Sequence, residues 1–330
     1  MAIQFRNTGP AAAPRAGIVE PTGARAIRGG TRPSLLGLLV SKVVVPILYG
    51  GRDTTPEAFL RRIAKDRKRG PAPPPRRIAK RYRVVDAPIA GVRSFRLDPR
   101  TVPMPATRIL HLHGGAYVFN LIAEQWPALA SMADSTGSAL IIPDYPLAPV
   151  HQVADGLAAM VAVYSQLVDE VGADRIVISG DSAGGGFALA LAQHLRDRGL
   201  PAPAGLVLFF PWLDVTVSGD DQPALQKRDA MLSIERLREA GRMWAGDADP
   251  AEPRVSPLFG DPSGLPPTLV LVGTDDLLLS DARRLAARFP EAIVQEYPDM
   301  FHGWVFAPIR EARQALAAAS AFIGRVLTGS

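Results

Sequence analysis

The chain has 330 residues, 47% of them hydrophobic and 21% charged, which is the composition of a soluble globular protein with one large domain or two ordinary ones. Because it has no cysteine, disulfides, thiolate metal sites and a cysteine nucleophile are excluded. The net charge of +5 is unevenly spread: residues 1–85 carry 18 Lys and Arg against 4 Asp and Glu (net +14), and the rest carries 19 against 28 (net −9). Solvated cations on exposed helices and loops are the simpler explanation of the basic segment, and an anionic membrane or polyanion is the alternative.

The N-terminal residues 1–31 lack the apolar core of a secretory signal and are rich in Gly, Ala, Pro and Arg, so we expect a flexible tail and a cytoplasmic protein. The run SLLGLLVSKVVVPIL (Ser34–Leu48) is shorter than the roughly 20 apolar residues that span a bilayer, and Lys42 and Pro46 interrupt it. We therefore expect a soluble helix with one wide apolar face that must pack on another surface. Interfacial membrane contact is the minor alternative.

From about residue 82, β-type runs alternate with helical ones. Several runs, such as GLVLFF and TLVLVG, are apolar throughout, as in strands buried on both faces of a parallel sheet. The alternation predicts an α/β fold with an eight-stranded, mostly parallel sheet flanked by helices, and the first two strands predict an antiparallel hairpin at one edge. The expected strands are Arg81–Val85, Val92–Leu97, Ile109–His113, Ala139–Pro143, Arg175–Ser179, Leu206–Phe210, Thr268–Val272 and Ile293–Tyr297. The expected helices between and after them are Trp126–Ser135, Val153–Val171, Ala183–Gly199, Asp281–Phe289 and Ile309–Leu327.

Two segments fall outside this alternation. Residues 1–80 are basic and helical, and residues 214–264 form a long excursion between two core strands, with a helix near Ser233–Ala245. Such an excursion is commonly a lid or a functional loop. We therefore expect the sheet domain to consist of residues 81–213 and 265–330.

A serine occupies a tight turn rich in glycine. Gly180-Asp181-Ser182-Ala183-Gly184 fits G-x-S-x-G directly after a predicted buried strand and before a helix, which is the setting of a nucleophile elbow. The sharp turn would hold the Ser182 hydroxyl above the sheet edge, and side chains at Gly180 and Gly184 would collide with the neighbouring strand and helix. The helix N-terminus adds partial positive charge where an oxyanion develops. A glycine-rich cap or a phosphate-binding loop is the alternative, but the flanking strand and helix favour a nucleophile.

A serine nucleophile needs a general base. His302 lies in YPDMFHGWVF, just past the last predicted strand, on a loop that can reach over the C-terminal edge of the sheet. His194 falls within the helix after the elbow, where a surface position is expected. A partly buried histidine beside aromatic residues is the alternative for His302. The five histidines of the chain are His111, His113, His151, His194 and His302.

The base in turn needs an acid that orients it and stabilises the imidazolium. The stretch LVLVGTDDLLLSDARRL supplies Asp275 and Asp276 at a strand end, and Asp281 opens the next helix, where a carboxylate caps an N-terminus. The chemistry of the residues leaves Asp275 and Asp276 equivalent. With either of them, the order along the chain is Ser, Asp, His.

A loop suited to an oxyanion follows another predicted strand. In LHLHGGAYVF, the glycines after His113 would let main-chain N–H groups approach an anion closely. An ordinary glycine turn explains this loop when it stands alone. Together with the serine elbow, the histidine loop and the strand-end aspartates, it indicates a hydrolase site.

With these motifs, the chain resembles the hormone-sensitive-lipase-like (family IV) carboxylesterases of the α/β-hydrolase superfamily over residues 82–327; the motifs are HGGAY, DYPLAP, GDSAGG, FFPWLD and HGW. The resemblance implies an α/β-hydrolase fold with a helical cap. It also implies a serine carboxylesterase that hydrolyses short-to-medium acyl esters, or lactones, through an acyl-enzyme. Ser182 would be the nucleophile, His302 the base and Asp276 the acid, which decides between the two aspartates.

The resemblance also implies further residues of the site. The oxyanion donors would be the main-chain N–H groups of Gly114, Gly115 and Ala183, while His113 and Asp144 would brace the loops by hydrogen bonds. The cap of the family combines the N-terminal segment with the insertion after the sixth strand. Residues 1–80 and 214–264 occupy those places, so the apolar run Ser34–Leu48 would roof the active site.

Two residues depart from the family pattern. Ala116 stands where the family often has a third glycine, so we expect a narrower oxyanion loop that disfavours esters of bulky tertiary alcohols, and Val150 replaces a glutamate. We expect a small-molecule ester as substrate, no cofactor, no metal and no nucleic-acid partner; related esterases are often homodimers through edge strands. An amidase or deacetylase with the same triad is the first alternative. A non-catalytic binding protein on this scaffold is the second, but such proteins typically lose the histidine that His302 retains.

Overall fold

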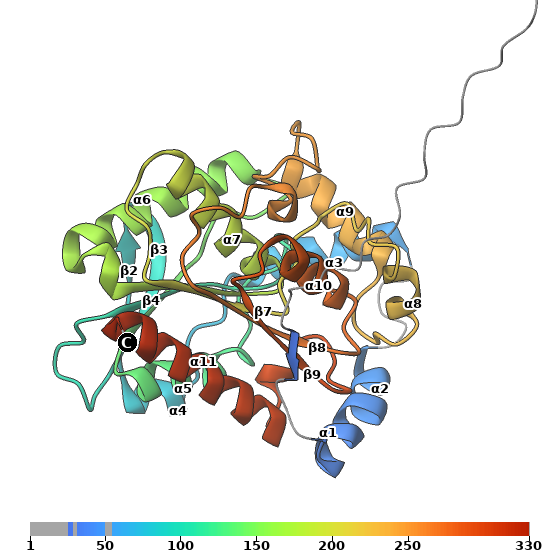
Figure 1. Ribbon diagram of the computed structural model, residues 1–330, viewed down its shortest axis with the longest axis horizontal. Helices are drawn as coiled ribbons and strands as arrows, with labels where there is room; N and C mark the ends of the chain where they lie inside the picture. The colour runs from blue at the N-terminus through green and yellow to red at the C-terminus, as the bar shows by residue number, and fades with distance from the viewer. Residues whose placement is uncertain (1–25, 29–31, 50–54, 330) are drawn as a thin grey trace, which may run out of the picture.

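The computed structural model describes residues 26–28, 32–49 and 55–329. Nine strands form one sheet in the order β1-β9-β8-β7-β6-β4-β5-β3-β2 (Figure 1). Neighbouring strands are parallel except that β3 is antiparallel to β2 and to β5. The strands are β1 (Ala26–Arg28), β2 (Tyr82–Ile89), β3 (Val92–Pro99), β4 (Arg108–Leu112), β5 (Ala139–Pro143), β6 (Ile176–Asp181), β7 (Gly205–Phe209), β8 (Thr268–Gly273) and β9 (Ile293–Tyr297).

The sheet confirms the eight strands and the edge hairpin that the sequence predicts. Every residue of the central strands β4, β5, β6, β7 and β8 is buried, which explains their continuous apolar runs. The short strand β1 is an addition to the prediction: it pairs with β9 over three residues, inside the stretch interpreted as a flexible tail. A three-residue edge strand carries no alternating pattern that could reveal it. The rest of the expected tail, residues 1–25 and 29–31, lies outside the described residues.

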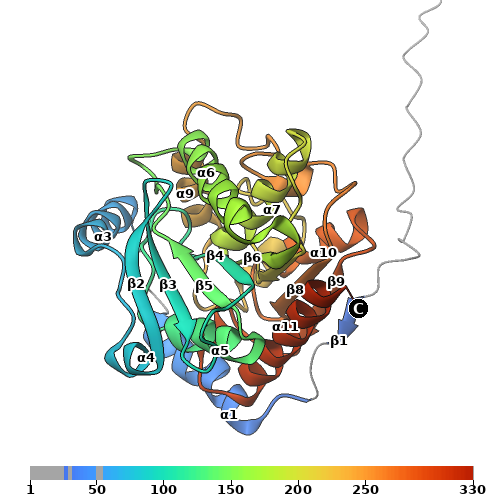
Figure 2. The same cartoon turned by 90° about the vertical axis from the view of Figure 1, so that its left-hand side faces the viewer.

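Helices cover both faces of the sheet. Figure 2 shows α6 and α7 on one face and α5 and α11 on the other. Each helix expected between or after the core strands is present, with its ends shifted by two residues at most. Among the described helices, none has the length and apolar character needed to cross a bilayer. The helices are α1 (Leu35–Leu39), α2 (Val45–Tyr49), α3 (Pro56–Arg69), α4 (Arg76–Arg81), α5 (Trp126–Thr136), α6 (Val153–Val171), α7 (Ala183–Asp197), α8 (Gln222–Gln226), α9 (Ile234–Ala245), α10 (Leu279–Arg288) and α11 (Arg310–Thr328), with a π-helical turn η1 (Val40–Val44) and short 3₁₀ turns η2 (Ala173–Arg175), η3 (Pro257–Phe259) and η4 (Trp304–Phe306).

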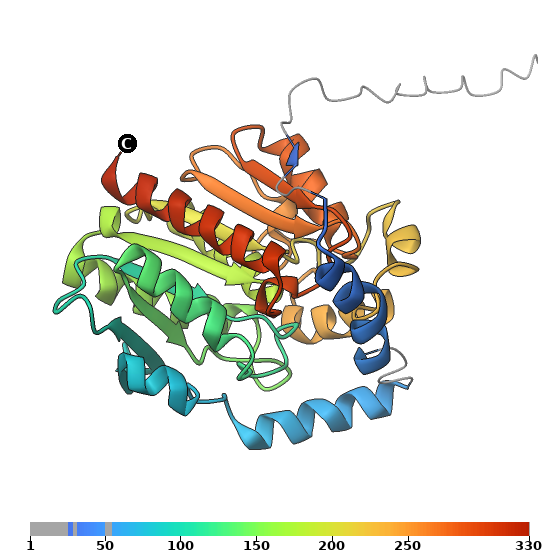
Figure 3. The ribbon, with the colours of Figure 1, turned by 90° about the horizontal axis from the view of Figure 1, so that it is seen from below.

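The apolar run Ser34–Leu48 forms the helical segment α1-η1-α2 on the outside of the domain (Figure 3). Val45 is the apolar side chain of this segment that is buried in the core, and Val40 packs against the core beside it. The other inward contacts are polar: the main-chain N–H and the hydroxyl of Ser34 donate to Glu311 at 2.6 and 3.0 Å, and Lys42 pairs with Asp275. Its exposed apolar side chains are Leu35, Leu36, Leu39, Val43, Val44, Ile47 and Leu48. The expectation that the apolar face is packed is therefore met only at Val45 and Val40, and most apolar side chains of the run face outward.

Candidate active site

Ser182 occupies the turn between β6 and α7. Its backbone has φ 53° and ψ −122°, in a region that residues with a side chain rarely adopt. A Cβ atom on Gly180 would lie 2.2 Å from the carbonyl oxygen of Gly184, and one on Gly184 would lie 1.9 Å from the carbonyl oxygen of Leu112, the last residue of β4. The turn therefore requires glycine at both positions, as the sequence predicts, and it sets Ser182 at the C-terminal edge of the sheet.

The structure brings together the three residues predicted to do the chemistry. The Nε2 atom of His302 lies 3.0 Å from the Ser182 hydroxyl, and its Nδ1 atom lies 2.9 Å from Oδ2 of Asp276. Because a carboxylate only accepts hydrogen bonds, Nδ1 carries the proton and the Nε2 lone pair faces the serine hydroxyl. Burial lowers the pKa of His302, but the charge and hydrogen bond of Asp276 outweigh it, so this pKa is raised above its ordinary 6.5.

The two adjacent aspartates, which the residue chemistry leaves equivalent, have separate surroundings. Asp276 is fully buried and contacts His302. Asp275 instead pairs with Lys42 of the N-terminal helical segment and with Arg228 of the insertion, whose Nε lies 2.9 Å from Oδ1 of Asp275. Asp276 is therefore the acid within reach of the base, and Asp275 links the domain to the two segments outside the alternation.

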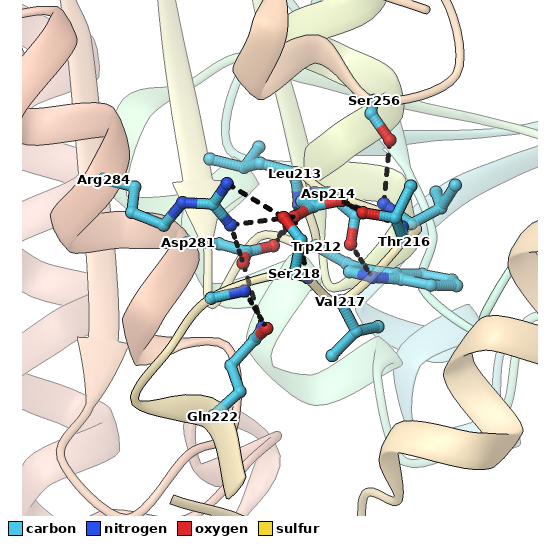
Figure 4. A network of polar contacts seen from close by, with 12 residues as sticks. Trp212, Leu213, Asp214, Thr216, Val217, Ser218, Gln222, Ser256, Asp281 and Arg284 are labelled. Carbon is cyan, nitrogen blue, oxygen red and sulfur yellow. Dashed lines mark hydrogen bonds and ion pairs between the residues drawn. The ribbon is translucent and has the colours of Figure 1, made fainter. Parts of the chain in front are cut away.

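Asp281 lies in the first turn of α10 but does not cap this helix as the sequence suggests. Its Oδ2 atom accepts the main-chain N–H groups of Leu213 and Asp214 at 2.8 and 3.0 Å. Burial and the negative charge of Asp214 raise the pKa of Asp281 to about 8. Asp214 is also held by Arg284 of the same helix at 2.8 Å (Figure 4). The network fixes the start of the insertion on α10, which begins just after the turn that carries Asp276.

The oxyanion loop differs from its prediction at one residue. The main-chain N–H of Gly114, predicted as an oxyanion donor, donates to Oδ1 of Asp181 at 3.0 Å, so this group is already engaged in the structure. The next residues, Gly115 and Ala116, have φ of 127° and 52° and line the cavity above Ser182. A Cβ atom on Gly115 would lie 2.6 Å from a main-chain carbonyl oxygen of the same loop, which explains why glycine is needed there.

Asp181, the residue before Ser182, has a structural role that the sequence reasoning missed. Besides the Gly114 amide, its Oδ1 atom accepts hydrogen bonds from Nε2 of His111 and from the Gln125 side chain, each at 3.0 Å. It therefore joins the serine elbow to the oxyanion loop. The only signal in the sequence is an acidic residue at the second position of G-x-S-x-G, where a solvated side chain is equally well accommodated.

His113 braces the oxyanion loop as the resemblance implies. Its Nδ1 atom donates to the carbonyl oxygen of Gly114 at 2.7 Å, and its ring stacks on Tyr145 with 4.5 Å between the ring centroids. Burial lowers the pKa of His113 to about 4, so the ring is neutral at physiological pH. Asp144 has no such role: within the described residues only its main-chain N–H is hydrogen-bonded, to the carbonyl oxygen of Arg93 at 2.8 Å.

A cavity of about 480 Å³ opens above Ser182 and His302. It lies between the oxyanion loop, one side of α3 and residues 231–237 of the insertion. In the described part of the chain, no three His, Asp or Glu side chains are arranged as metal ligands. The large apolar residues that line the cavity are Phe59, Phe119, Ile122, Phe210, Met231, Leu232, Leu237 and Phe306.

The roof of this cavity differs from the expected one. Helix α3 and residues 231–237 line it, whereas no residue of Ser34–Leu48 does. The apolar run is held instead on the outside of the domain by Lys42 and Ser34. The expectation that this run roofs the active site is therefore wrong, although α3 comes from the same N-terminal segment.

Comparisons with known proteins agree with this fold. A family model of the alpha/beta hydrolase fold matches residues 109–306. An esterase of Acinetobacter venetianus is 37% identical over 242 residues, which cover 69% of this chain and 78% of that protein. An acetyl-hydrolase of Streptomyces hygroscopicus is 34% identical over 245 residues, which cover 72% and 79%. The crystal structure of an esterase from the bacterial hormone-sensitive lipase family has a TM-score of 0.77 at 28% identity, over 89% of this chain and 99% of that one.

The fold and the matched family define an α/β hydrolase. Within this class, the chain belongs to the hormone-sensitive-lipase-like (family IV) carboxylesterases and is a carboxylic ester hydrolase. The family and the class of enzyme inferred from the sequence motifs are thus confirmed.

Proposed function

We propose that Ser182, His302 and Asp276 form a catalytic triad that hydrolyses short-to-medium acyl esters through an acyl-enzyme. The observation that carries this proposal is the continuous hydrogen-bonded chain between the three side chains, with distances of 3.0 and 2.9 Å. The strained elbow supports it further, because strain of this kind persists at sites where the reaction needs a fixed geometry.

In the proposed reaction, the Ser182 hydroxyl attacks the ester carbonyl while His302 Nε2 takes the hydroxyl proton. Asp276 stabilises the imidazolium that forms. The tetrahedral intermediate then collapses, and the imidazolium gives its proton to the leaving alcohol, which leaves the acyl group on Ser182. Water, activated by His302, repeats the two steps and releases the acid.

The oxyanion hole is proposed to consist of the main-chain N–H groups of Gly115 and Ala183. Gly115 lies in the loop after β4, and Ala183 is the first residue of α7, where the helix N-terminus adds positive potential. Ala116 follows Gly115 along the cavity, so its N–H is the candidate to replace the engaged Gly114 donor. Each such donor is typically worth about 10²–10³ in kcat.

The cavity supports the proposed range of substrates. Its aromatic and aliphatic lining favours an apolar acyl chain, and its volume of about 480 Å³ suits a short-to-medium chain. The methyl group of Ala116 lies on this lining, so we retain the expectation that esters of tertiary alcohols are poor substrates. We also infer that α3 and the insertion act as the cap, because both line the cavity from outside the sheet domain.

Labelling with a fluorophosphonate and turnover of p-nitrophenyl butyrate test the proposal together. We expect the probe to modify Ser182 in the wild type and Ser182→Ala to lower kcat by roughly 10⁶. Wild-type-like turnover in Ser182→Ala would refute the assignment. Matched esters and amides of one acyl group test the alternative of an amidase: faster cleavage of the amide would favour that alternative.

A further inference from the structure

A second buried carboxylate lies close to the proposed triad without belonging to it. Asp229, in the insertion after α8, is 8% exposed and accepts three main-chain hydrogen bonds. Its Oδ1 atom accepts the N–H groups of Met231 at 2.7 Å and Leu232 at 2.9 Å, and its Oδ2 atom accepts that of Leu277 at 2.8 Å. One side chain therefore joins two stretches of chain that are distant in sequence.

The first stretch carries the proposed catalytic acid. Leu277 directly follows Asp276, and the next N–H, that of Leu278, donates to Oδ1 of Asp276 at 2.8 Å. Successive main-chain N–H groups of this turn are thus held by Asp229 and by Asp276 itself. Removing the Asp229 carboxylate would leave the buried Leu277 N–H without its acceptor and free the turn to move.

The second stretch forms a wall of the substrate cavity. Met231 and Leu232, whose N–H groups Asp229 accepts, both line this cavity. Arg228, the residue before Asp229, pairs with Asp275, which is adjacent to the proposed catalytic acid. The insertion is therefore attached to the acid's turn at two adjacent points, one of which also fixes the cavity wall.

The charge of Asp229 also interacts with the charged groups of the proposed triad. Burial and the charge of Asp276 raise the pKa of Asp229 to about 6, against the lowering effects of His302 and of the N–H groups. Its charge acts in turn on the base: after burial, which lowers it, and Asp276, which raises it, Asp229 is the next group that raises the pKa of His302. The residue before Asp229, Arg228, is a cation, and its positive charge is paired with the Asp275 carboxylate.

We propose that the Asp229 carboxylate is a positioning residue of this esterase, which fixes the turn of Asp276 and presents a second negative charge to the His302 imidazolium. The proposal rests on the proposed triad. It goes beyond it by giving the insertion a part in the proton transfer as well as in substrate binding.

The pH dependence of kcat/KM for p-nitrophenyl butyrate tests this role, because its acid limb reports the ionisation of the free enzyme's base. Asp229→Asn removes the charge with little change of shape. Since the imidazolium then loses a stabilising charge, we expect the acid limb to move to lower pH by about 0.5 unit or more. At pH 8 we expect kcat/KM to fall by about tenfold. Asp229 accepts main-chain hydrogen bonds through both carboxylate oxygens, whereas an asparagine amide has one oxygen that can accept them.

Two control variants separate positioning from mere folding. Asp229→Glu keeps the charge, so its acid limb should stay at the wild-type pH even if KM rises. Asp214→Asn removes another buried carboxylate of the same insertion, one that accepts the N–H groups of Thr216 and Ser218 at 2.9 and 3.0 Å, and its limb should also stay. Thermal unfolding shows whether each variant is folded; if Asp229→Asn is not, Asp229→Ser takes its place with the same expectations.

An acid limb of Asp229→Asn at the wild-type pH, or one that moves equally in Asp214→Asn, would overturn the proposal. So would a limb in Asp229→Glu that moves as far as in Asp229→Asn. Failure of the triad itself is recognised separately, because the fluorophosphonate would then leave Ser182 unmodified in the wild type.

Discussion

The serine elbow and the N-terminal helical segment differ in how strongly the surrounding structure restricts each residue. At the elbow, local geometry dictates each residue: a Cβ atom on Gly184 would lie 1.9 Å from a carbonyl oxygen of β4, and the surrounding strands are buried throughout. In the segment Ser34–Leu48, polar side chains and the buried Val45 make the contacts, and other apolar side chains such as Leu35 and Ile47 are 87% and 75% exposed. The proposed nucleophile thus lies in a turn where steric contacts restrict the residue type, whereas the N-terminal segment leaves many of its positions exposed.

The two adjacent aspartates allow the comparison to be tested at single residues, with the largest expected effect after that of Ser182→Ala. Asp276 is hydrogen-bonded to His302, the proposed base, so Asp276→Asn should lower kcat by about 10⁴, because the imidazole then loses its orientation and its stabilising charge. Asp275 holds Lys42 and Arg228, so Asp275→Asn should change kcat by less than about tenfold.

Asp275→Asn should instead lower the melting temperature, since two cations lose a buried partner. Steady-state kinetics and thermal unfolding of both variants provide the measurement. If Asp275→Asn abolished activity and Asp276→Asn did not, the assignment of the acid would be reversed.

A smaller effect is expected in the pH dependence of stability. The pKa of Asp281 is raised from 3.8 to about 8, so between about pH 4 and 8 the native protein holds a proton that the unfolded chain has released. The free energy of unfolding should therefore decrease as the pH rises through this range. The pKa of Asp214 is lowered, so this residue makes the free energy of unfolding increase with rising pH, but only at acidic pH.

The melting temperature of the wild type and of Asp281→Asn, measured from pH 5 to 9, tests this prediction. The wild type should lose a few degrees across the range, and the variant, which stays uncharged, should lose less. Parallel curves would show that Asp281 is not the group responsible.

The smallest effect on catalysis should follow changes in the exposed apolar segment. Leu35→Ser combined with Ile47→Ser should leave kcat/KM for a soluble ester within about twofold of the wild type, because neither side chain lines the cavity. Phe59→Ser is the matched change on α3, which does line it, and should raise KM. Equal losses of activity in the double variant and in Phe59→Ser would indicate that the apolar run does cover the active site.

The outcome also shows what the sequence can reveal. Runs such as GLVLFF and TLVLVG predict buried strands because both faces of the sheet are covered, and the elbow is legible because its glycines are sterically required. The engagement of the Gly114 amide could not be predicted, since it depends on where the Asp181 side chain points in the folded protein.

The orientation of Ser34–Leu48 could not be predicted either, because it also depends on contacts that form only in the folded protein. Hydrophobic periodicity identifies an apolar face, but the partners that turned this face outward, Glu311 and Asp275, lie more than 200 residues away in the sequence. Tertiary contacts of this kind decide the placement of a helix against its local pattern.

The most direct measurement is the identity of the residue that carries the acyl group during turnover. The wild type is mixed with p-nitrophenyl butyrate, quenched in acid at steady state and digested, and the peptides are analysed by mass spectrometry. We expect a butyryl group on Ser182 and on no other residue. Ester hydrolysis with Ser182 unmodified and a butyryl group elsewhere would contradict the proposed mechanism.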